Sequence, residues 1–186
     1  MIDYDSIIER FYDKGTPLYD VLVIHSRQVA ELAAQLCERV IAKGMPVDAD
    51  FVYEAAMLHD IGIIKTDADG IHCHGTEPYI MHGTLGRKML DEMGLYRHAL
   101  VCERHTGAGL SVKDIESQNL PLPHRDLLPI SLEEKIVCYA DKFFSKTHLG
   151  EAPKPMARVR MQMQRFGDDS LARFDEMAAL LGDVEE

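Results

Sequence analysis

Two adjacent side chains, His59 and Asp60, end an apolar run and are followed by Gly62, where the backbone can turn away from them. Imidazole and carboxylate groups both coordinate divalent cations, so two neighbours at a helix end can be aimed at one ion. A His-Asp pair alone is common in proteins and also fits a polar helix terminus. What it means therefore depends on the other histidines and acidic residues of the chain.

Further residues of these two types lie on separate predicted helices, at inward-facing or helix-end positions: His25, His82, His105 and Asp141. Any one of these histidines alone would more commonly be a core residue bonded to a backbone carbonyl. A carboxylate on an apolar face, such as that of Asp141, is costly unless a metal or an ion pair neutralises it. With His59 and Asp60 the set exceeds what one tetrahedral ion uses, so we expect two ions bridged by Asp60.

Helices are the elements that must position these residues, because apolar side chains repeat every three or four positions through much of the chain. The expected helices cover residues 4–12, 18–43, 51–59, 79–93, 96–105 and 111–118. A Ser-x-x-Glu capping box at Ser131 opens another helix, which carries Asp141 and Phe144, and two amphipathic patterns follow Pro155. Because strand patterns are almost absent, the sequence predicts an all-α fold.

The polar segment 66–75 contains three residues of metal-ligand type, His72, Cys73 and His74. Residues so close together on one loop cannot by themselves close a tetrahedral site. We therefore expect this segment to be an irregular loop over the mouth of the site.

A chain of 186 residues is long enough for one well-buried domain and short for two. We expect a helical-bundle domain over residues 1–150, with its core at about 18–146. Residues 151–186 then form a C-terminal helical extension that packs on the core or at a subunit contact. The second arrangement would make the protein a homo-oligomer.

Charge and composition exclude several classes of partner. The net charge is −11 and no cluster of Lys and Arg is interleaved with aromatic residues, so we expect no nucleic acid partner. The N-terminus lacks the basic and apolar regions of a signal peptide, and no apolar run approaches the ~20 residues of a membrane span. The four cysteines are scattered, as in reduced cytoplasmic proteins. These features predict a cytoplasmic protein with no membrane partner.

The order of His25, His59, Asp60 and Asp141 along the chain resembles the HD superfamily of metal-dependent phosphohydrolases. The letters His-Asp-Ile-Gly at 59–62 match its HDIG subgroup. The resemblance covers roughly residues 18–146, and the ordered set is specific although each piece is weak. It implies an HD-domain helical bundle in which these four residues hold one metal ion.

His82 and His105 are similar to the additional ligands of the binuclear branch of that superfamily. The resemblance implies that they hold a second ion, which shares Asp60. The native metal stays open among iron, manganese, zinc, nickel and magnesium, because imidazole with carboxylate serves several borderline and hard cations.

The resemblance implies a metal-dependent phosphohydrolase that cleaves a phosphate ester or anhydride in a small substrate, such as a nucleotide. Two cations would activate a water and neutralise developing charge, with Asp60 as the catalytic bridge between them. Lys65 and Arg104 are the nearest cationic side chains that could contact the substrate phosphate, and each fits a solvated surface charge equally well. Phosphomonoesterase, phosphodiesterase and nucleotide pyrophosphohydrolase activities are not separated by these residues.

Two alternatives belong to other classes. The same six ligand positions could hold two irons that activate dioxygen, as in some proteins of this fold, because imidazole and carboxylate also serve iron. The chain could also be a non-catalytic regulator that binds a metal or a nucleotide.

Overall fold

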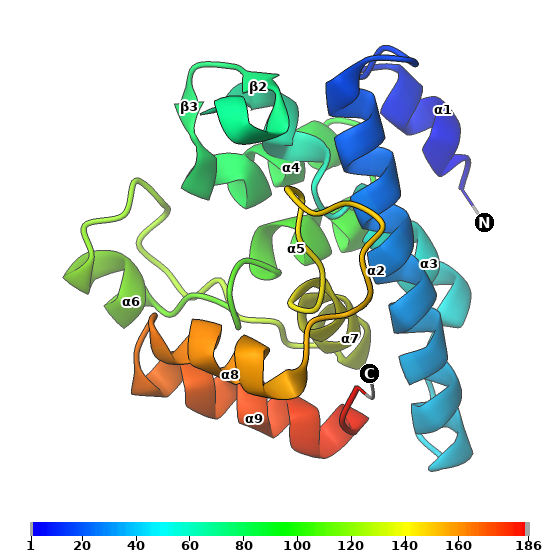
Figure 1. Ribbon diagram of the computed structural model, residues 1–186, viewed down its shortest axis with the longest axis vertical. Coiled ribbons are helices and arrows are strands. Elements are labelled where there is room, and N and C mark those ends of the chain that lie inside the picture. The colour runs from blue at the N-terminus through cyan, green and yellow to red at the C-terminus, as the bar shows by residue number, and fades with distance from the viewer. Residues whose placement is uncertain (1, 185–186) are drawn as a thin grey trace.

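The computed structural model describes residues 2–184; residues 1, 185 and 186, at the outer ends of the two predicted domains, lie outside that range. Its regular structure is mostly helical, with 61% of the chain in helices, which confirms the all-α prediction (Figure 1). The α-helices are α1 (Tyr4–Glu9), α2 (Pro17–Ala42), α3 (Ala49–Leu58), α4 (His82–Asp91), α5 (Tyr96–Arg104), α6 (Val112–Ser117), α7 (Leu132–Asp141), α8 (Met156–Gln164) and α9 (Asp168–Leu181).

The start of α2 shows how local chemistry fixes the helix ends. The Thr16 hydroxyl accepts a hydrogen bond from the Tyr19 backbone N–H, and Pro17 occupies the first helical position, where its missing N–H is not needed. The buried stripe of α2 includes Leu22, Val29 and Leu36, and it packs against α3 and α7. This long helix therefore forms one wall of the bundle (Figure 1).

The N-terminus of α7 departs from the predicted capping box. Ser131 caps the helix by accepting from the Glu134 backbone N–H, as expected. The Glu134 carboxylate, however, does not return to Ser131; it accepts from the Ile130 backbone N–H and pairs with Arg104 of α5. The α-helix also ends at Asp141 and does not include Phe144. An ion pair between helices thus replaces half of the local motif.

The segment before α4 is more ordered than the predicted loop. It forms a small sheet in the order β2-β1-β3, in which β1 is antiparallel to β2 and parallel to β3. The strands are β1 (Thr66–Ala68), β2 (Cys73–His74) and β3 (Glu77–Pro78). Strands of two or three residues are too short to show an alternating pattern, so the sequence reading missed them.

A close contact between two backbones holds the 3-10 helix η1 (Ile61–Lys65) against α4. A Cβ atom on Gly62 would lie 2.1 Å from the His82 carbonyl oxygen and 2.4 Å from the Gly86 nitrogen. Gly62 is therefore required for close approach of the segments that carry Asp60 and His82.

The C-terminal helices α8 and α9 pack on each other at the base of the view in Figure 1, and α9 contacts α7. The Phe174 ring of α9 stacks on the Tyr139 ring of α7, with centroids 5.2 Å apart. Whether residues 151–186 form a separate extension stays a prediction. None of the helices within residues 2–184 combines the length and hydropathy that crossing a membrane requires.

Candidate metal centre

The structure brings the predicted ligands together in two groups that share one residue. The first group is His25, His59, Asp60 and Asp141, and the second is Asp60, His82 and His105. Within each group the candidate ligand atoms all lie within 4.8 Å of one another. We refer to these residues together as the metal centre.

Helix ends supply most of these side chains. His59 and Asp60 follow the last residue of α3, His82 is the first residue of α4, and His105 directly follows α5. Asp141 is the last residue of α7. His25 alone comes from the middle of a helix, within the buried stripe of α2. Packing of five helices is therefore what assembles the centre.

Asp60 lies between the two groups and is fully buried. Its Oδ2 atom is 3.2 Å from His25 Nε2 and 3.0 Å from His59 Nε2. Its Oδ1 atom is 3.5 Å from His82 Nε2 and 3.4 Å from His105 Nε2. Each carboxylate oxygen thus faces the nitrogens of a different group.

Three of the histidines, His59, His82 and His105, use their other ring nitrogen in the same way. Each Nδ1 donates to the carbonyl oxygen of the residue three positions earlier, at 2.6 to 2.7 Å. A carbonyl oxygen only accepts, so Nδ1 carries a hydrogen and Nε2 is the nitrogen that faces the centre, where a neutral ring offers a lone pair. The same arrangement orients histidines that bind metals in proteins.

A metal ion would give several buried polar atoms of the centre a partner. Among the described residues, His59 Nε2 and both carboxylate oxygens of Asp60 are buried without a partner of hydrogen-bond geometry. The Nε2 atoms of His82 and His105 lie only 3.1 Å apart. A divalent ion between these atoms would accept their lone pairs, so the residues present fit a centre with nitrogen and oxygen ligands.

The histidines of the centre differ in charge because their neighbours differ. Burial, reinforced by the neighbouring His105, lowers the pKa of His82 to about 3. Burial also acts to lower the pKa of His59, but the carboxylates of Asp60 and Asp141 outweigh it and raise that pKa to about 9. Although burial opposes ionisation of Asp60, His59 and Lys146 hold its pKa well below the usual range. The Asp60 carboxylate is therefore negatively charged at neutral pH.

Two lysines that the sequence analysis did not single out reach the centre. Lys146 Nζ is 2.6 Å from Asp60 Oδ2, and Lys142 Nζ is 2.7 Å from Asp141 Oδ2. Lys142 also donates to the His105 carbonyl oxygen at 2.9 Å. Both residues lie just after the end of α7, so their closeness to Asp141 in the sequence was the signal that could have found them.

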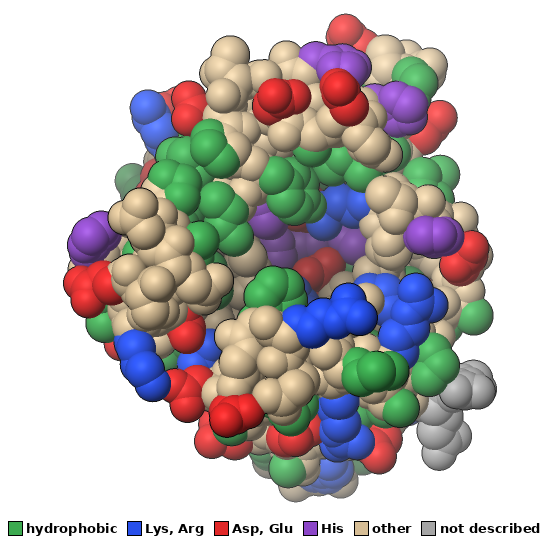
Figure 2. Space-filling view, turned by 60° about the vertical axis from the view of Figure 1, so that its left-hand side comes forward, with side chains coloured by type: hydrophobic (Ala, Val, Ile, Leu, Met, Phe, Trp, Pro, Cys, Tyr) green, Lys and Arg blue, Asp and Glu red, His purple; other side chains and the backbone are tan. Residues whose placement is uncertain are grey.

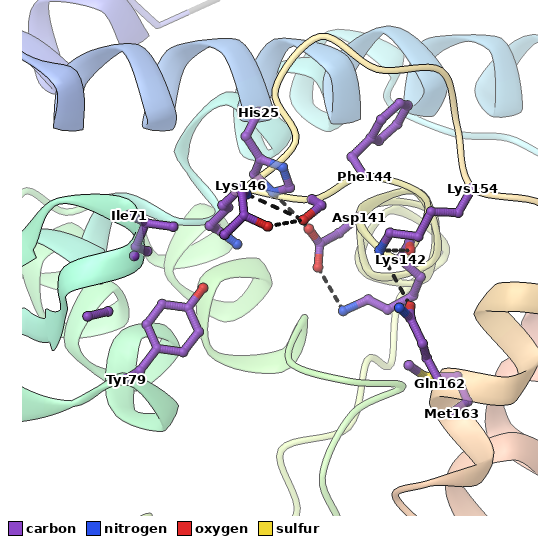
Figure 3. A pocket seen from close by; sticks show the side chains of 14 residues that line it. His25, Ile71, Tyr79, Asp141, Lys142, Phe144, Lys146, Lys154, Gln162 and Met163 are labelled. Carbon is purple, nitrogen blue, oxygen red and sulfur yellow. Dashed lines mark hydrogen bonds and ion pairs between the residues drawn. The ribbon is translucent and has the colours of Figure 1, made fainter.

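A pocket opens from solvent onto the first metal group, and we call it the cationic pocket. Its volume is about 390 Å³, and its lining includes His25, Asp141, Tyr79, Lys142, Lys146 and Lys154. Figure 3 shows Lys142 and Lys146, from the segment after α7, and Tyr79, from the segment before α4, around this space. Figure 2 shows a hollow in one face of the molecule, with histidine, acidic and basic side chains at its bottom.

The two predicted phosphate contacts lie elsewhere in the structure. Lys65 is exposed at the end of η1 and lines a different pocket, with Phe11 and Glu92. Both oxygens of Glu134 accept from Arg104 Nη1, at 2.9 and 3.0 Å. Among the described residues, neither side chain forms an ion pair with Asp60 or Asp141, and their catalytic roles stay predictions.

The remaining histidines stay outside the centre. His72, at the end of the 3-10 helix η2 (Asp69–Ile71), has left-handed backbone, with φ 61°. The exposed His74 pairs with Asp69. His124 is also exposed and lies 3.7 Å from Glu116. None of the three belongs to either group of candidate ligands.

The chain belongs to the HD domain family, because a family model described as "HD domain" matches residues 22–145. An uncharacterised protein of Methanocaldococcus jannaschii is 40% identical over 127 residues, which are 68% of each chain. No solved structure gives a significant match. The family match confirms the predicted HD-type helical fold and a site of the kind that holds divalent metal ions.

Two other relatives carry a named activity. A tRNA (cytidine(56)-2'-O)-methyltransferase of Picrophilus torridus is 34% identical over 126 residues, 68% of this chain and 32% of that protein. The protein of the same name from Thermoplasma volcanium is 32% identical over 144 residues, 77% of this chain and 37% of that protein. The chain therefore spans about a third of the length of these two relatives.

These names contradict the expectation of a metal-dependent phosphohydrolase. The activity printed for both relatives is methyl transfer to a tRNA, and no phosphate ester or anhydride is cleaved in such a reaction. The prediction was wrong because it passed from a family resemblance, carried by the metal ligands, to one reaction. Imidazole and carboxylate ligands identify a metal centre, and the same ligands serve several chemistries.

Proposed function

We propose that this HD-domain chain binds two divalent metal ions that share Asp60 and, beside them, a small molecule that carries a phosphate group. The proposal rests on the position of Asp60. One carboxylate oxygen faces His25 and His59, and the other faces His82 and His105. A carboxylate with imidazole nitrogens on both sides has the donors for an ion on each side.

The lysines of the cationic pocket support the anionic ligand. Lys142, Lys146 and Lys154 line the same pocket as His25 and Asp141. The whole chain carries a net charge of −11, so this pocket is a local exception to an acidic molecule. Ammonium groups beside bound cations give a phosphate several positive partners at once.

Metal analysis of the purified protein, followed by calorimetric titration with inorganic phosphate, tests the proposal. We expect His59→Ala and Asp60→Ala to lose bound metal and His124→Ala to keep it. Lys146→Met should keep the metal and weaken phosphate binding by about tenfold or more, because it removes one charge-assisted hydrogen bond. A protein that binds no divalent cation, or that binds phosphate equally well after Lys146→Met, would contradict the proposal.

We further propose that the chain acts in tRNA 2'-O-methylation as a metal-binding unit that works with the methyltransferase. The observation that favours this role is that two proteins named for that activity contain a stretch similar to this chain. The net charge of −11 disfavours direct contact with RNA, so we place the chain against the enzyme and not on the tRNA.

Nucleoside mass spectrometry of tRNA from cells that lack this chain tests the second role. We expect the 2'-O-methylcytidine content to fall and to return when the wild-type chain is restored. Restoration by Asp60→Ala would show that the metal centre is not needed for the role. An unchanged methylcytidine content without the chain would rule the role out.

A further inference from the structure

A second pocket lies beside the metal centre, and we call it the apolar pocket. Its volume is about 260 Å³, far more than a single water occupies. Apolar atoms form nearly all of its wall, and the side chains that supply them include Ile80, Leu110, Leu120 and Phe166. Its chemistry therefore differs from that of the cationic pocket, although Tyr79 lines both.

The apolar pocket lies between a small hydrophobic cluster and the C-terminal helices. The small cluster is separate from the main core, and its buried residues are Ile115, Leu122 and Leu127. Ile80, Leu110 and Leu120 pack against this cluster and also line the pocket. Phe166 and residues of α9 supply another part of the wall. The pocket is therefore a gap between two packed parts of the molecule, and apolar side chains beside the small cluster face it.

The charged residues of the apolar pocket neutralise each other. Arg173 Nη2 donates to Asp114 at 2.8 Å, and also to the Gly109 carbonyl oxygen at 3.1 Å. Arg173 Nε donates to the Ala108 carbonyl oxygen at 3.3 Å. With its guanidinium engaged in this way, Arg173 is not free to hold an anion, and Asp114 is not free to hold a cation. The charges of the wall therefore favour an uncharged ligand.

Neither water nor a protein segment suits a pocket of this kind. Buried water is held by several hydrogen bonds to polar groups, and nearly all of this wall is apolar. A peptide segment would bring backbone N–H and C=O groups that lose their hydrogen bonds with water when they are buried there. An uncharged apolar molecule loses no such hydrogen bonds, and contact with the wall removes its surface from water.

We propose that the apolar pocket is a binding site for a small, uncharged, apolar organic molecule, held between the small hydrophobic cluster and Phe166. Phe166 lies just after α8 and is 58% exposed, so a ligand that covers its ring also removes apolar protein surface from water. The site adjoins the metal centre, because His82 lines it. The inference does not depend on the proposed binding of metal and phosphate, which concerns the other pocket.

Fluorescence titration of the full chain with two probes tests the assignment. N-phenylnaphthylamine is uncharged, and anilinonaphthalene sulfonate carries the same rings with a sulfonate group. We expect the uncharged probe to bind about tenfold or more tightly, because a buried sulfonate would have no free partner in the apolar pocket. Equal or tighter binding of the sulfonate would overturn the assignment. The uncharged probe should also raise the Tm, because it binds the folded chain. A lower Tm would show that it binds the unfolded chain instead.

The variant Phe166→Ala tests whether the probe lies in this pocket. Because Phe166 is exposed, the fold should stay intact, while the uncharged probe should bind about tenfold more weakly through lost apolar contact. Met161→Ala is the matched control, since Met161 is 62% exposed on α8 and is not among the residues that line the apolar pocket. Lys146→Met alters the cationic pocket and should also leave binding of the uncharged probe unchanged. No loss in Phe166→Ala, an equal loss in Met161→Ala, or a loss in Lys146→Met would place the probe elsewhere and disprove the site.

Discussion

The buried histidines of this protein differ in pKa, because the charged groups beside each of them differ. In the metal centre, carboxylates outweigh burial at His59, while burial prevails at His82. A third case lies away from the centre. His98 on α5 is buried, and its Nε2 lies 3.1 Å from Glu54 Oε2. Burial lowers the pKa of His98 in spite of the opposing Glu54 carboxylate.

We predict that His98 makes the fold less stable in mild acid. Its pKa is lower in the folded chain than the ~6.5 of an exposed histidine, so the unfolded chain binds the proton more tightly. The stability contribution is therefore complete above about pH 6.5 and is lost as the pH falls toward the folded-state pKa. His98→Gln should flatten the pH dependence of the unfolding free energy. Urea unfolding at about pH 5.5 and about pH 7.5 measures this slope.

The matched control is His124→Gln, because His124 is exposed and should leave the slope as in the wild-type chain. An equal slope in wild-type and His98→Gln protein would refute the argument. The metal-centre histidines are unchanged in both variants, so their own titration cancels from the comparison.

Among single residues, the sequence analysis found the candidate metal ligands and missed the lysines beside them. Asp141 was predictable because a carboxylate on an apolar helix face demands a partner, and Asp60 because it adjoins His59 at a helix end. The only signal for Lys142 and Lys146 was their closeness to Asp141 in the sequence, and it was missed because a lysine after a helix is usually a solvated charge. Only the packing of α5 against α7 shows that Arg104 is engaged by Glu134.

The packing of one helix against another depends in places on close backbone contacts at a glycine. Gly62 in η1 is the clearest example, since a Cβ atom there would overlap the backbone of α4. A side chain could yield to such a contact, but hydrogen-bonded backbone cannot. The approach of η1 to α4 also sets the separation of Asp60 from His82, so it belongs to the metal centre as well as to the core.

We predict that Gly62→Ala destabilises the protein by about 1–3 kcal/mol or more and weakens metal binding at the same time, because η1 and α4 must move apart. Chemical denaturation and metal titration of the same samples measure both effects. Gly70→Ala is the matched control, because nothing lies within 4 Å of a Cβ atom at that position. Equal stability of the two variants would show that the contact is not tight.

The sequence predicted those helices in which the repeat of apolar residues extends over many turns. The stripe of α2 repeats through many turns and identified the helix to within about a residue at each end. The segment before α4 has no such repeat, and its strands are held by pairing between Thr66–Ala68 and its two neighbours. Non-local pairing of that kind leaves little trace in a local pattern.

For the molecule as a whole, metal binding at the proposed centre would be coupled to folding. The ligands of the centre come from five helices, so the site exists only when these helices are packed. An ion that binds the folded chain alone adds about 2.7 kcal/mol of stability at a concentration 100 times its Kd. The net charge of −11 adds a general attraction for cations, which salt weakens.

We predict that removing metal with a chelator lowers the Tm by several degrees and that adding the native ion back restores it. Differential scanning calorimetry at fixed ionic strength measures the shift. In Asp60→Ala protein the Tm should not respond to the ion. A Tm that rises equally in wild-type and Asp60→Ala protein would attribute the effect to surface charge.

The contact between His25 and Asp141 joins positions 116 residues apart in the chain. Closing so long a loop is slow, and the ligands can meet only after most of the bundle has docked. An ion captured that late cannot hasten folding, but it must leave before the helices separate. Metal bound at the proposed centre would therefore slow unfolding and lengthen the lifetime of the native chain.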